Sequence, residues 1–323
     1  MKILIVGGAG YIGSCCTQIL LDQGHTAVVY DSLVKGHREA VDPRARFIQG
    51  DLADRNRVFS LLEDERPDGI IHFGAFIEVG ESMQDPGMYF RNNVANGLNL
   101  VDAAVAHGNP KIVFSSTAAV YGMPKTIPIP ETEPAKPISP YGDSKYMFER
   151  ILNWYHQIHD LPYVALRYFN AAGATDKYGE DHSPESHLIP NVLKAATGEG
   201  EGIKMFGDDY PTPDGTCVRD YIHIRDLAQA HLDALEKEAV GSFNLGSGTG
   251  YSVKEIIDVA REVTGTDIPV TVAPRRPGDP PQLISDSTEA RRVLGWTPQH
   301  DDIQSIVGSA WAWRKAHPHG YDE

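Results

Sequence analysis

Short apolar runs alternate with helix-length segments through the first half of this chain, and no other feature of the sequence restricts the fold as strongly. The apolar runs cover residues 3–6, 26–30, 46–49, 69–73, 111–114 and 163–166. Strands separated by helices form right-handed crossover units, so the strands are parallel and helices cover both faces of the sheet. We therefore predict an α/β protein built on a Rossmann-type doubly wound parallel sheet.

The alternation ends after Asn170, where loops rich in Gly, Pro and Asp separate shorter helical patterns. We predict a Rossmann domain over residues 1–170, with a returning segment near residues 219–245. A smaller mixed α/β domain is expected over residues 171–323. Its closing segment, residues 315–323, is expected to be a loosely packed tail.

A glycine-rich turn follows the first apolar run directly and precedes a helical pattern. Its glycines are Gly8, Gly10 and Gly13. Missing side chains let the backbone approach a pyrophosphate at the start of the helix, as in dinucleotide-binding turns. Asp31 follows at the end of the second apolar run, roughly 20 residues further on, where an acid binds ribose hydroxyls. An acid there repels a 2'-phosphate and favours NAD over NADP, although Lys35 and Arg38 lie nearby. A plain strand-to-helix turn is the alternative.

A second acidic residue follows the third apolar run. Asp51, with Leu52 after it, stands where a carboxylate can accept a hydrogen bond from an adenine amino group. Capping of the helix expected to start near Asp54 is a compatible second role for Asp51.

Tyr141 and Lys145 are four residues apart in a helical pattern over residues 141–158, so they share one helix face. Tyrosine ordinarily loses its proton near pH 10, and nearby positive charge lowers that pKa enough for a general base. With 14 tyrosines in the chain, about one such spacing is expected by chance. The pair becomes informative because it follows an apolar strand, the hydroxyl cluster that ends at Thr117, and a proline-rich loop over residues 123–140.

Composition excludes several classes of protein. A formal net charge of −15 argues against nucleic-acid partners, which bind basic surfaces. No apolar run approaches the roughly 20 residues needed to cross a bilayer. The first residues read as a buried strand without a signal-peptide pattern, and we expect a cytoplasmic protein of 323 residues.

Cysteine and histidine spacing predicts neither a disulfide framework nor a metal site. The three cysteines are expected to be small buried side chains. His156 and His159 are three residues apart on a predicted helix, but no third ligand lies near them in the sequence. We predict that both face solvent and that the chain holds no metal.

Several motifs together resemble the UDP-glucose 4-epimerase family, which belongs to the extended short-chain dehydrogenases/reductases. The motifs cover residues 7–13, 31–33, 72–73, 79–82, 114–122, 139–145, 167–170, 208–223 and 275–279. The resemblance covers essentially the whole chain. The glycine turn and the Tyr-Lys pair are common to the superfamily, whereas the motifs after residue 166 are more specific to these epimerases.

The resemblance implies a bound NAD that is regenerated in each cycle. Tyr141 would take the proton of the sugar 4-hydroxyl while the 4-hydride passes to NAD. The resulting 4-keto sugar would turn about its link to the diphosphate and receive the hydride on its other face. Lys145 would also bind the nicotinamide ribose, and Thr117 would bind the sugar 4-oxygen in place of the more common serine.

The resemblance also places a set of residues around NAD. They are Gly7, Gly10, Tyr11, Ile12, Gly13, Asp31, Ser32, Leu33, Lys35, Gly36, Asp51, Leu52, Phe73, Gly74, Ala75, Ile77, Asn92, Tyr141, Lys145 and Phe169. Many family members have a lysine at the position of Ile77, so this chain lacks one charged cofactor contact.

A second set is implied for a UDP-sugar. It consists of Thr117, Asn170, His187, Leu188, Lys204, Met205, Phe206, Arg219, Arg276, Asp279 and Leu283. Arg219 and Arg276 would bind the diphosphate, because a guanidinium meets phosphate oxygens in two places. Surface ion pairs with Asp220 and Asp279 are their alternative role. The resemblance further places Asp279 on the uridine ribose and residues 204–206 beside the uracil.

One position in the substrate set, His187, departs from the family pattern, and another, Leu283, leaves the sugar specificity open. His187 replaces an asparagine and can still donate one hydrogen bond, although it is equally compatible with a helix start without a ligand. Leu283 occupies a place where a bulky aromatic narrows the sugar pocket and a small residue admits an N-acetyl group. Leucine is intermediate in size, so turnover of UDP-GlcNAc remains open.

Other functions differ in the groups that they require. A nucleotide-sugar dehydratase needs an acid and a base directly after Thr117, where this chain has Ala118 and Ala119. A 4-epimerase of another UDP-sugar, such as a pentose, would share every catalytic group. A non-catalytic NAD-binding protein would need no catalytic trio.

The resemblance implies a homodimer formed by helices over residues 89–106 and 141–158, although amphipathic helices on a sheet have the same pattern.

Overall fold

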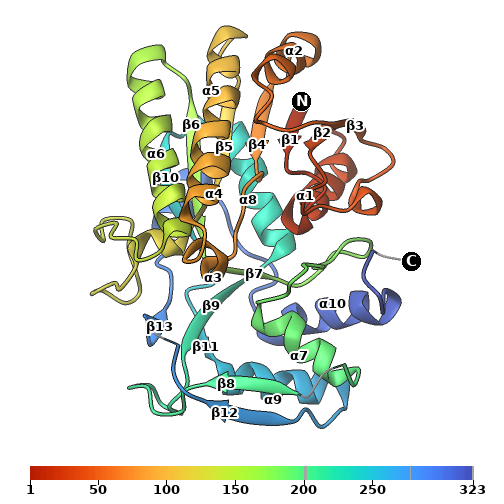
Figure 1. Cartoon of the computed structure of the whole chain (residues 1–323), viewed down its shortest axis with the longest axis vertical. Helices are drawn as coiled ribbons and strands as arrows, with labels where there is room; N and C mark the ends of the chain where they lie inside the picture. The colour runs from red at the N-terminus through yellow and green to blue at the C-terminus, as the bar shows by residue number, and fades with distance from the viewer. Residues whose placement is uncertain (200–201, 277, 322–323) are drawn as a thin grey trace.

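A seven-stranded parallel sheet forms the larger part of the computed structural model, which describes residues 1–199, 202–276 and 278–321 (Figure 1). Its strands are β1 (Lys2–Val6), β2 (Thr26–Asp31), β3 (Arg46–Gln49), β4 (Gly69–His72), β5 (Lys111–Thr117), β6 (Tyr163–Tyr168) and β10 (Gly241–Leu245). The strand order is β10-β6-β5-β4-β1-β2-β3, so the chain winds outward in both directions from β1. The predicted doubly wound sheet and its six apolar strands are confirmed.

Helices cover both faces of this sheet, because alternate side chains of each strand point in opposite directions. The helices are α1 (Tyr11–Asp22), α2 (Arg55–Glu65), α5 (Gly97–Ala106), α6 (Pro140–His159) and α8 (Ile224–Glu236). Ile3 and Ile5 belong to the core under α1 and α8. Leu4 and Val6 belong to the core under α2, α5 and α6. The strands are therefore packed against helices on both faces of the sheet, which fixes the positions of the strand ends.

The helix predicted over residues 89–106 is interrupted. The structure has α4 (Pro86–Phe90), a π-helical turn η2 (Arg91–Asn96), and then α5. Asp85 caps α4 by accepting a hydrogen bond from the N–H of Met88 at 3.0 Å. The wide turn buries Asn93, and a short helix α3 (Val79–Ser82) precedes it.

A smaller part lies below the large sheet in Figure 1. One of its sheets contains β7 (Asn170–Ala172), β9 (Val218–His223), β11 (Gly250–Ser252) and β13 (Gln282–Leu283), and the other contains β8 (Ile203–Phe206) and β12 (Val270–Ala273). Its helices are α7 (Leu188–Ala196), α9 (Val253–Thr264) and α10 (Ile303–Ala316). Elsewhere in the chain, short helical turns occur at η1 (Arg38–Ala40), η3 (Ala118–Tyr121) and η4 (Ala290–Leu294). The three helices enclose a core of their own that includes Val192, Ile256 and Ile306.

The chain passes from the large sheet into the smaller part and then returns. It leaves after β6, and β9 of the smaller part leads into α8, which packs against α1. β10 then pairs in parallel with β6, with Phe243 opposite Leu166. The edge of the large sheet is thus completed by residues far along the sequence.

The closing segment is better packed than the expected loose tail. The hydroxyl of Tyr321 accepts a hydrogen bond from the N–H of Gly179 at 3.1 Å, and the backbone N–H of Tyr321 donates to the carboxylate of Asp181 at 2.9 Å. Residues 322–323 lie outside the described part. The three cysteines are free and buried, as predicted. Among the described residues, no helix combines the length and apolar character needed to cross a membrane.

Candidate active site

The glycine turn after β1 leaves no room for side chains. A Cβ added to Gly7, whose φ is +79°, would lie 2.5 Å from the backbone nitrogen of Gly74. A Cβ added to Gly13 would lie 2.3 Å from the carbonyl oxygen of Gly7. Gly10 is the residue before the first turn of α1. The bare backbone at a helix N-terminus fits the diphosphate of a dinucleotide.

Asp31 lies at the end of β2, beside this turn. Its Oδ2 accepts a hydrogen bond from the N–H of Ala9 at 2.9 Å, and its Oδ1 accepts one from the N–H of Leu33 at 2.8 Å. Burial raises the pKa of Asp31 despite these bonds. The carboxyl group therefore lies beside the turn, where the ribose of a dinucleotide is expected.

The expected capping role of Asp51 belongs to a neighbouring residue. Asp54 caps α2 by accepting from the N–H of Arg57 at 3.0 Å. The side chain of Asp51 instead accepts from the N–H of Ala53 at 2.8 Å, within the turn before the helix. Asp51 is exposed at the end of β3, where it remains free to meet a ligand.

A buried asparagine that sequence reasoning missed fixes the loop after β4. Asn93 accepts from the N–H of Phe76 at 2.9 Å and donates to the carbonyl of Phe76 at 3.0 Å. It also donates to the hydroxyl of Ser144 at 3.1 Å. The loop with Ala75 and Ile77 is thereby tied to α6, one residue before Lys145. An asparagine within a helical pattern was the only sequence signal for this role.

The predicted catalytic residues come together where β5 ends and α6 begins. The hydroxyl of Thr117 lies close enough to that of Tyr141 to lower the pKa of the phenol through hydrogen bonding. The ammonium of Lys145 donates to the carbonyl of Ser115, two residues before the end of β5, at 2.7 Å. Ser139 caps α6 through the N–H of Gly142 at 3.2 Å. The strand end and the first turns of the helix are thus fixed relative to each other.

Burial changes the expected acidity of the Tyr-Lys pair. It raises the pKa of Tyr141, and the charge of Glu78 acts in the same direction, whereas the hydrogen bond with Thr117 lowers it. Burial also lowers the pKa of Lys145 to about 7, against the charge of Glu149. Within the protein itself, desolvation therefore raises the pKa of Tyr141 by more than the neighbouring groups lower it.

The residues implied for UDP lie on the smaller part. The guanidinium of Arg219, on β9, forms an ion pair with Asp279. The guanidinium of Arg276 lies 4.0 Å from the centre of the Phe206 ring at the end of β8. Lys204 is exposed on the same strand, and Met205 is half-buried. Asp220 is fully buried and accepts hydrogen bonds from Ser247 and Ser285, so the alternative pairing with Asp220 is not the one formed.

The remaining substrate positions line the region between the two parts. Asn170 donates to the carbonyl of Asp220 at 3.2 Å. Leu283 packs with a cluster that includes Ala118 and Phe169, directly beside Thr117. Leu283 therefore belongs to an apolar cluster next to the predicted catalytic residues.

His187 is held by acidic neighbours at the start of α7. Its Nδ1 lies 2.8 Å from a carboxylate oxygen of Glu185 and 2.9 Å from one of Glu180. Leu188 is the first residue of the helix that follows.

Residues 3–246 match the family model described as NAD dependent epimerase/dehydratase family. The chain belongs to this family. It is 53% identical to the UDP-glucose 4-epimerase of Streptococcus mutans over 100% of this chain and 99% of that protein. It is also similar to the UDP-glucose 4-epimerase of Brucella ovis solved with NAD, with a TM-score of 0.93 and 45% identity over 96% of this chain and 97% of that one. The enzyme of Bifidobacterium longum solved with NAD+ and UDP gives a TM-score of 0.94 and 36% identity, over 99% and 100%.

This NAD-dependent epimerase/dehydratase contains a buried ion pair that sequence reasoning missed. Arg167 and Glu149 make three contacts, Nε to Oε1 at 2.9 Å, Nε to Oε2 at 3.2 Å and Nη2 to Oε2 at 2.5 Å. Arg167 also donates to the hydroxyl of Tyr121 at 3.0 Å. Glu149 follows Lys145 by one helical turn on the buried face of α6, which was the available signal. The pair fixes the rotation of α6 against β6 and so the direction of Lys145.

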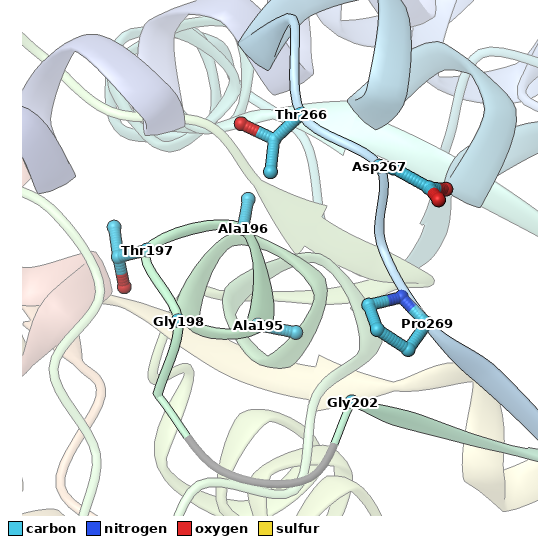
Figure 2. Close-up of a pocket in the computed structure, with 8 residues that line it drawn as sticks. All are labelled: Ala195, Ala196, Thr197, Gly198, Gly202, Thr266, Asp267 and Pro269. Carbon is cyan, nitrogen blue, oxygen red and sulfur yellow. The ribbon is translucent and has the colours of Figure 1, made fainter.

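A separate hollow in this NAD-dependent epimerase/dehydratase lies at the far end of α7 (Figure 2). It is lined by Ala195, Ala196, Thr197, Gly198, Gly202, Thr266, Asp267 and Pro269. None of these belongs to the predicted site, and Asp267 is the only ionisable side chain among them. Among the described residues this lining offers no acid-base pair, so we assign the chemistry to the strand ends.

Proposed function

We propose that this chain is an NAD-dependent 4-epimerase that interconverts UDP-glucose and UDP-galactose. The observation that carries the proposal is the convergence of Thr117, at the end of β5, with Tyr141 and Lys145 on α6, where Lys145 donates a hydrogen bond to the carbonyl of Ser115 on β5. The names of the relatives in Streptococcus mutans and Brucella ovis support the same reaction.

The proposed chemistry assigns a separate task to each member of the trio. NAD, when bound, accepts the hydrogen of sugar carbon 4 as hydride and returns it. Tyr141 takes the proton from the 4-hydroxyl and later gives it back to the 4-oxygen. Thr117 holds that oxygen through its hydroxyl, and the ammonium of Lys145 favours the ionised phenol. Epimerisation results because the sugar presents its opposite face before the return step.

We further propose a division of binding between the two parts. Residues 1–170, with the returning segment near residues 219–245, hold NAD at the glycine turn and the ends of the large sheet. Residues 171–323 hold the UDP-sugar. Arg219 lies on β9, which belongs to the smaller sheet and leads into the returning segment, and Arg276 follows β12, so their guanidiniums can take the diphosphate while Asp279 and β8 take the uridine.

A 4-epimerase of another UDP-sugar, such as a pentose, is the second candidate, since the catalytic trio is common to both. Dehydration is disfavoured because Ala118 and Ala119 follow Thr117 and neither can move a proton. A non-catalytic NAD-binding protein would have no use for Thr117, Tyr141 and Lys145 brought together where β5 ends and α6 begins.

The decisive test is incubation of the purified chain with UDP-galactose, without added cofactor, followed by NMR and by absorbance near 340 nm. Conversion to UDP-glucose without accumulation of NADH is the expected result. Retained NAD without conversion would transfer the proposal to another UDP-sugar. Absence of retained NAD together with absence of conversion would contradict it.

We propose that two copies pair through α6. Met147, Trp154 and Ile158 are exposed on this helix, and Ile151 lies half-buried between them. Their spacing forms one apolar stripe along the helix, as in helices that pack against a partner. Trp154→Glu with Ile158→Glu is expected to convert a dimer to a monomer in light scattering. A wild-type monomer, or a double variant that remains dimeric, would contradict this interface.

A cytoplasmic location is also proposed. Three buried cysteines that are free, rather than joined in disulfides, fit a reducing compartment. Fractionation of the source cells with an antibody against the chain would test this, and recovery outside the cytoplasmic fraction would contradict it.

A further inference from the structure

Four side chains with metal-binding atoms converge in the loop between β7 and α7. Glu180, His182, Glu185 and His187 each offer one nitrogen or oxygen, and these four atoms all lie within 4.8 Å of one another. The four residues fall within eight positions of the sequence, outside any helix or strand. Their convergence results from the path of the loop and not from helical spacing.

The distances between the ligand atoms match a tetrahedral site. The Nδ1 of His187 lies 2.9 Å from Glu180 and 2.8 Å from Glu185, and the Nδ1 of His182 lies 3.2 Å and 3.8 Å from the same two carboxylates. Ligands at about 2.0–2.1 Å from zinc in a tetrahedron are separated by about 3.4 Å. The observed separations lie on both sides of that value.

Hydrogen bonds within the cluster leave ligand atoms unsatisfied. His187 has at most one hydrogen on Nδ1, yet two carboxylates approach that atom at similar distances. Within the described residues, the Nδ1 of His182 and the Oε2 of Glu185 are buried and have no hydrogen-bond partner. The side chain of Glu185 is only 3% exposed. A buried carboxylate oxygen directed into the cluster requires a positive partner, which is either a protonated imidazole such as that of His182, 3.8 Å away, or a bound cation.

We propose that Glu180, His182, Glu185 and His187 bind one divalent cation of the zinc class. Two imidazole nitrogens and two carboxylate oxygens form a ligand set that suits zinc, whereas calcium and magnesium take oxygen ligands in larger number. Four protein ligands complete a tetrahedron and leave no open position for a reacting water. The site is therefore a structural one.

The neighbours of the four-residue cluster indicate which segments a bound cation would hold together. The ring of His182 meets the edge of Tyr11, the first residue of α1, with ring centres 6.2 Å apart. Ser186 donates to the carboxylate of Glu78, in the loop before α3, at 2.6 Å. His187 directly precedes α7. A cation here would fix the start of α7 against the glycine-turn helix on the other side of the active site.

Metal analysis of the full-length, untagged protein tests the proposal. Purified protein is expected to contain about one zinc per chain, and a chelator should remove it. Titration of the metal-free chain with Co²⁺ should then give the intense visible absorption of tetrahedral cobalt, which saturates at one equivalent. Zinc added afterwards should abolish this absorption and raise the melting temperature.

Two ligand variants and one control variant complete the experiment. Glu185→Gln and His182→Gln should each weaken Co²⁺ binding more than tenfold, whereas His159→Gln, an exposed histidine on α6, should bind as the wild type does. If Glu185→Gln fails to fold, His182→Gln alone decides the matter. Failure of the wild type to bind Zn²⁺ or Co²⁺ at micromolar concentration would overturn the proposal. Equal binding by the ligand variants, or an octahedral cobalt spectrum, would also overturn it.

Discussion

Arg219 and Asp279 form an ion pair with each other, although the family resemblance assigns them to different portions of UDP. The contact joins Nη2 of Arg219 to Oδ1 of Asp279, and both side chains are largely shielded from water. A second guanidinium nitrogen of Arg219 donates to the carbonyl of Val218 at 2.8 Å. The guanidinium is thus oriented by protein groups, and a diphosphate would have to compete with the carboxylate for it.

Arg219→Lys should raise KM for UDP-galactose at least tenfold and change kcat less. Lysine replaces a planar two-point contact with a single charge, and hydrogen bonds to charged groups contribute about 1.5–3 kcal/mol each. Steady-state kinetics would measure both constants. Arg225→Lys is the matched control, because Arg225 on α8 pairs with the exposed Asp176, which lies in the loop after β7. An unchanged KM in Arg219→Lys would remove Arg219 from the substrate site.

Tyr141→Phe should lower kcat by about 10²–10⁴, the usual contribution of a positioned acid-base group. The cofactor should remain bound, because the glycine turn and Asp31 are unaffected. NMR assays and release of nucleotide from denatured protein would give the two quantities. Tyr155→Phe, on the same helix, removes only a hydroxyl bonded to Asp102 and should retain activity. A Tyr141→Phe variant with wild-type turnover would exclude this base.

Leu283→Tyr should reduce any activity on UDP-GlcNAc more than activity on UDP-glucose. Leu283 packs with Ala118 and Phe169 beside Thr117, so the ring of a tyrosine at this position would enter the space next to the sugar. The ratio of kcat/KM for the two substrates would report the change. Leu283→Met keeps the side-chain volume and serves as control. Equal losses on both substrates would contradict this position for the pocket wall.

Lys145 should make folding less favourable as the pH falls. Burial lowers its pKa from 10.5 to about 7, so between these values the unfolded chain holds a proton that the folded chain lacks. Stability from this group is complete above pH 10.5, declines toward pH 7 and is constant below. His72 and Glu149 also face this ammonium.

Lys145→Met removes this dependence. Relative to the wild type, the variant should gain about 3 kcal/mol more at pH 6 than at pH 9, from 1.36 kcal/mol for each pKa unit. Urea unfolding of both proteins, after removal of nucleotide, would measure the difference. A gain that does not change with pH would show that the ammonium is charged in the fold throughout this range.

Local patterns predicted the sheet strands and the shared helix of Tyr141 and Lys145 because each depends on short spacing, whereas Thr117 was assigned through the family resemblance. Apolar runs gave the six strands, and the four-residue spacing placed Tyr141 and Lys145 on one face of α6. The π-helical turn before α5 could not be predicted in this way, since its cause is the burial of Asn93 against Phe76, a contact made across the fold.

The features that escaped prediction depend on contacts between distant segments or on the path of a loop. Glu149 meets Arg167 only after β6 has joined β5. The ion pair of Arg219 with Asp279, across sixty positions, was one of the two roles that the sequence left open for Arg219. His156 and His159 illustrate the opposite case, since helical spacing drew attention to them. His159 is exposed, and the Nδ1 of His156 lies 3.1 Å from the carbonyl of Leu161.

The late arrival of β10 in the large sheet has a consequence for biosynthesis. A ribosome that has released residues 1–170 has supplied only six of the seven strands, and α8, which covers α1, is still missing. The nascent chain must keep an unpaired edge at β6 until residue 245 emerges. Exchange of the smaller part between related enzymes therefore requires three crossover points in the gene, one after β6 and one on each side of the segment that contains α8 and β10.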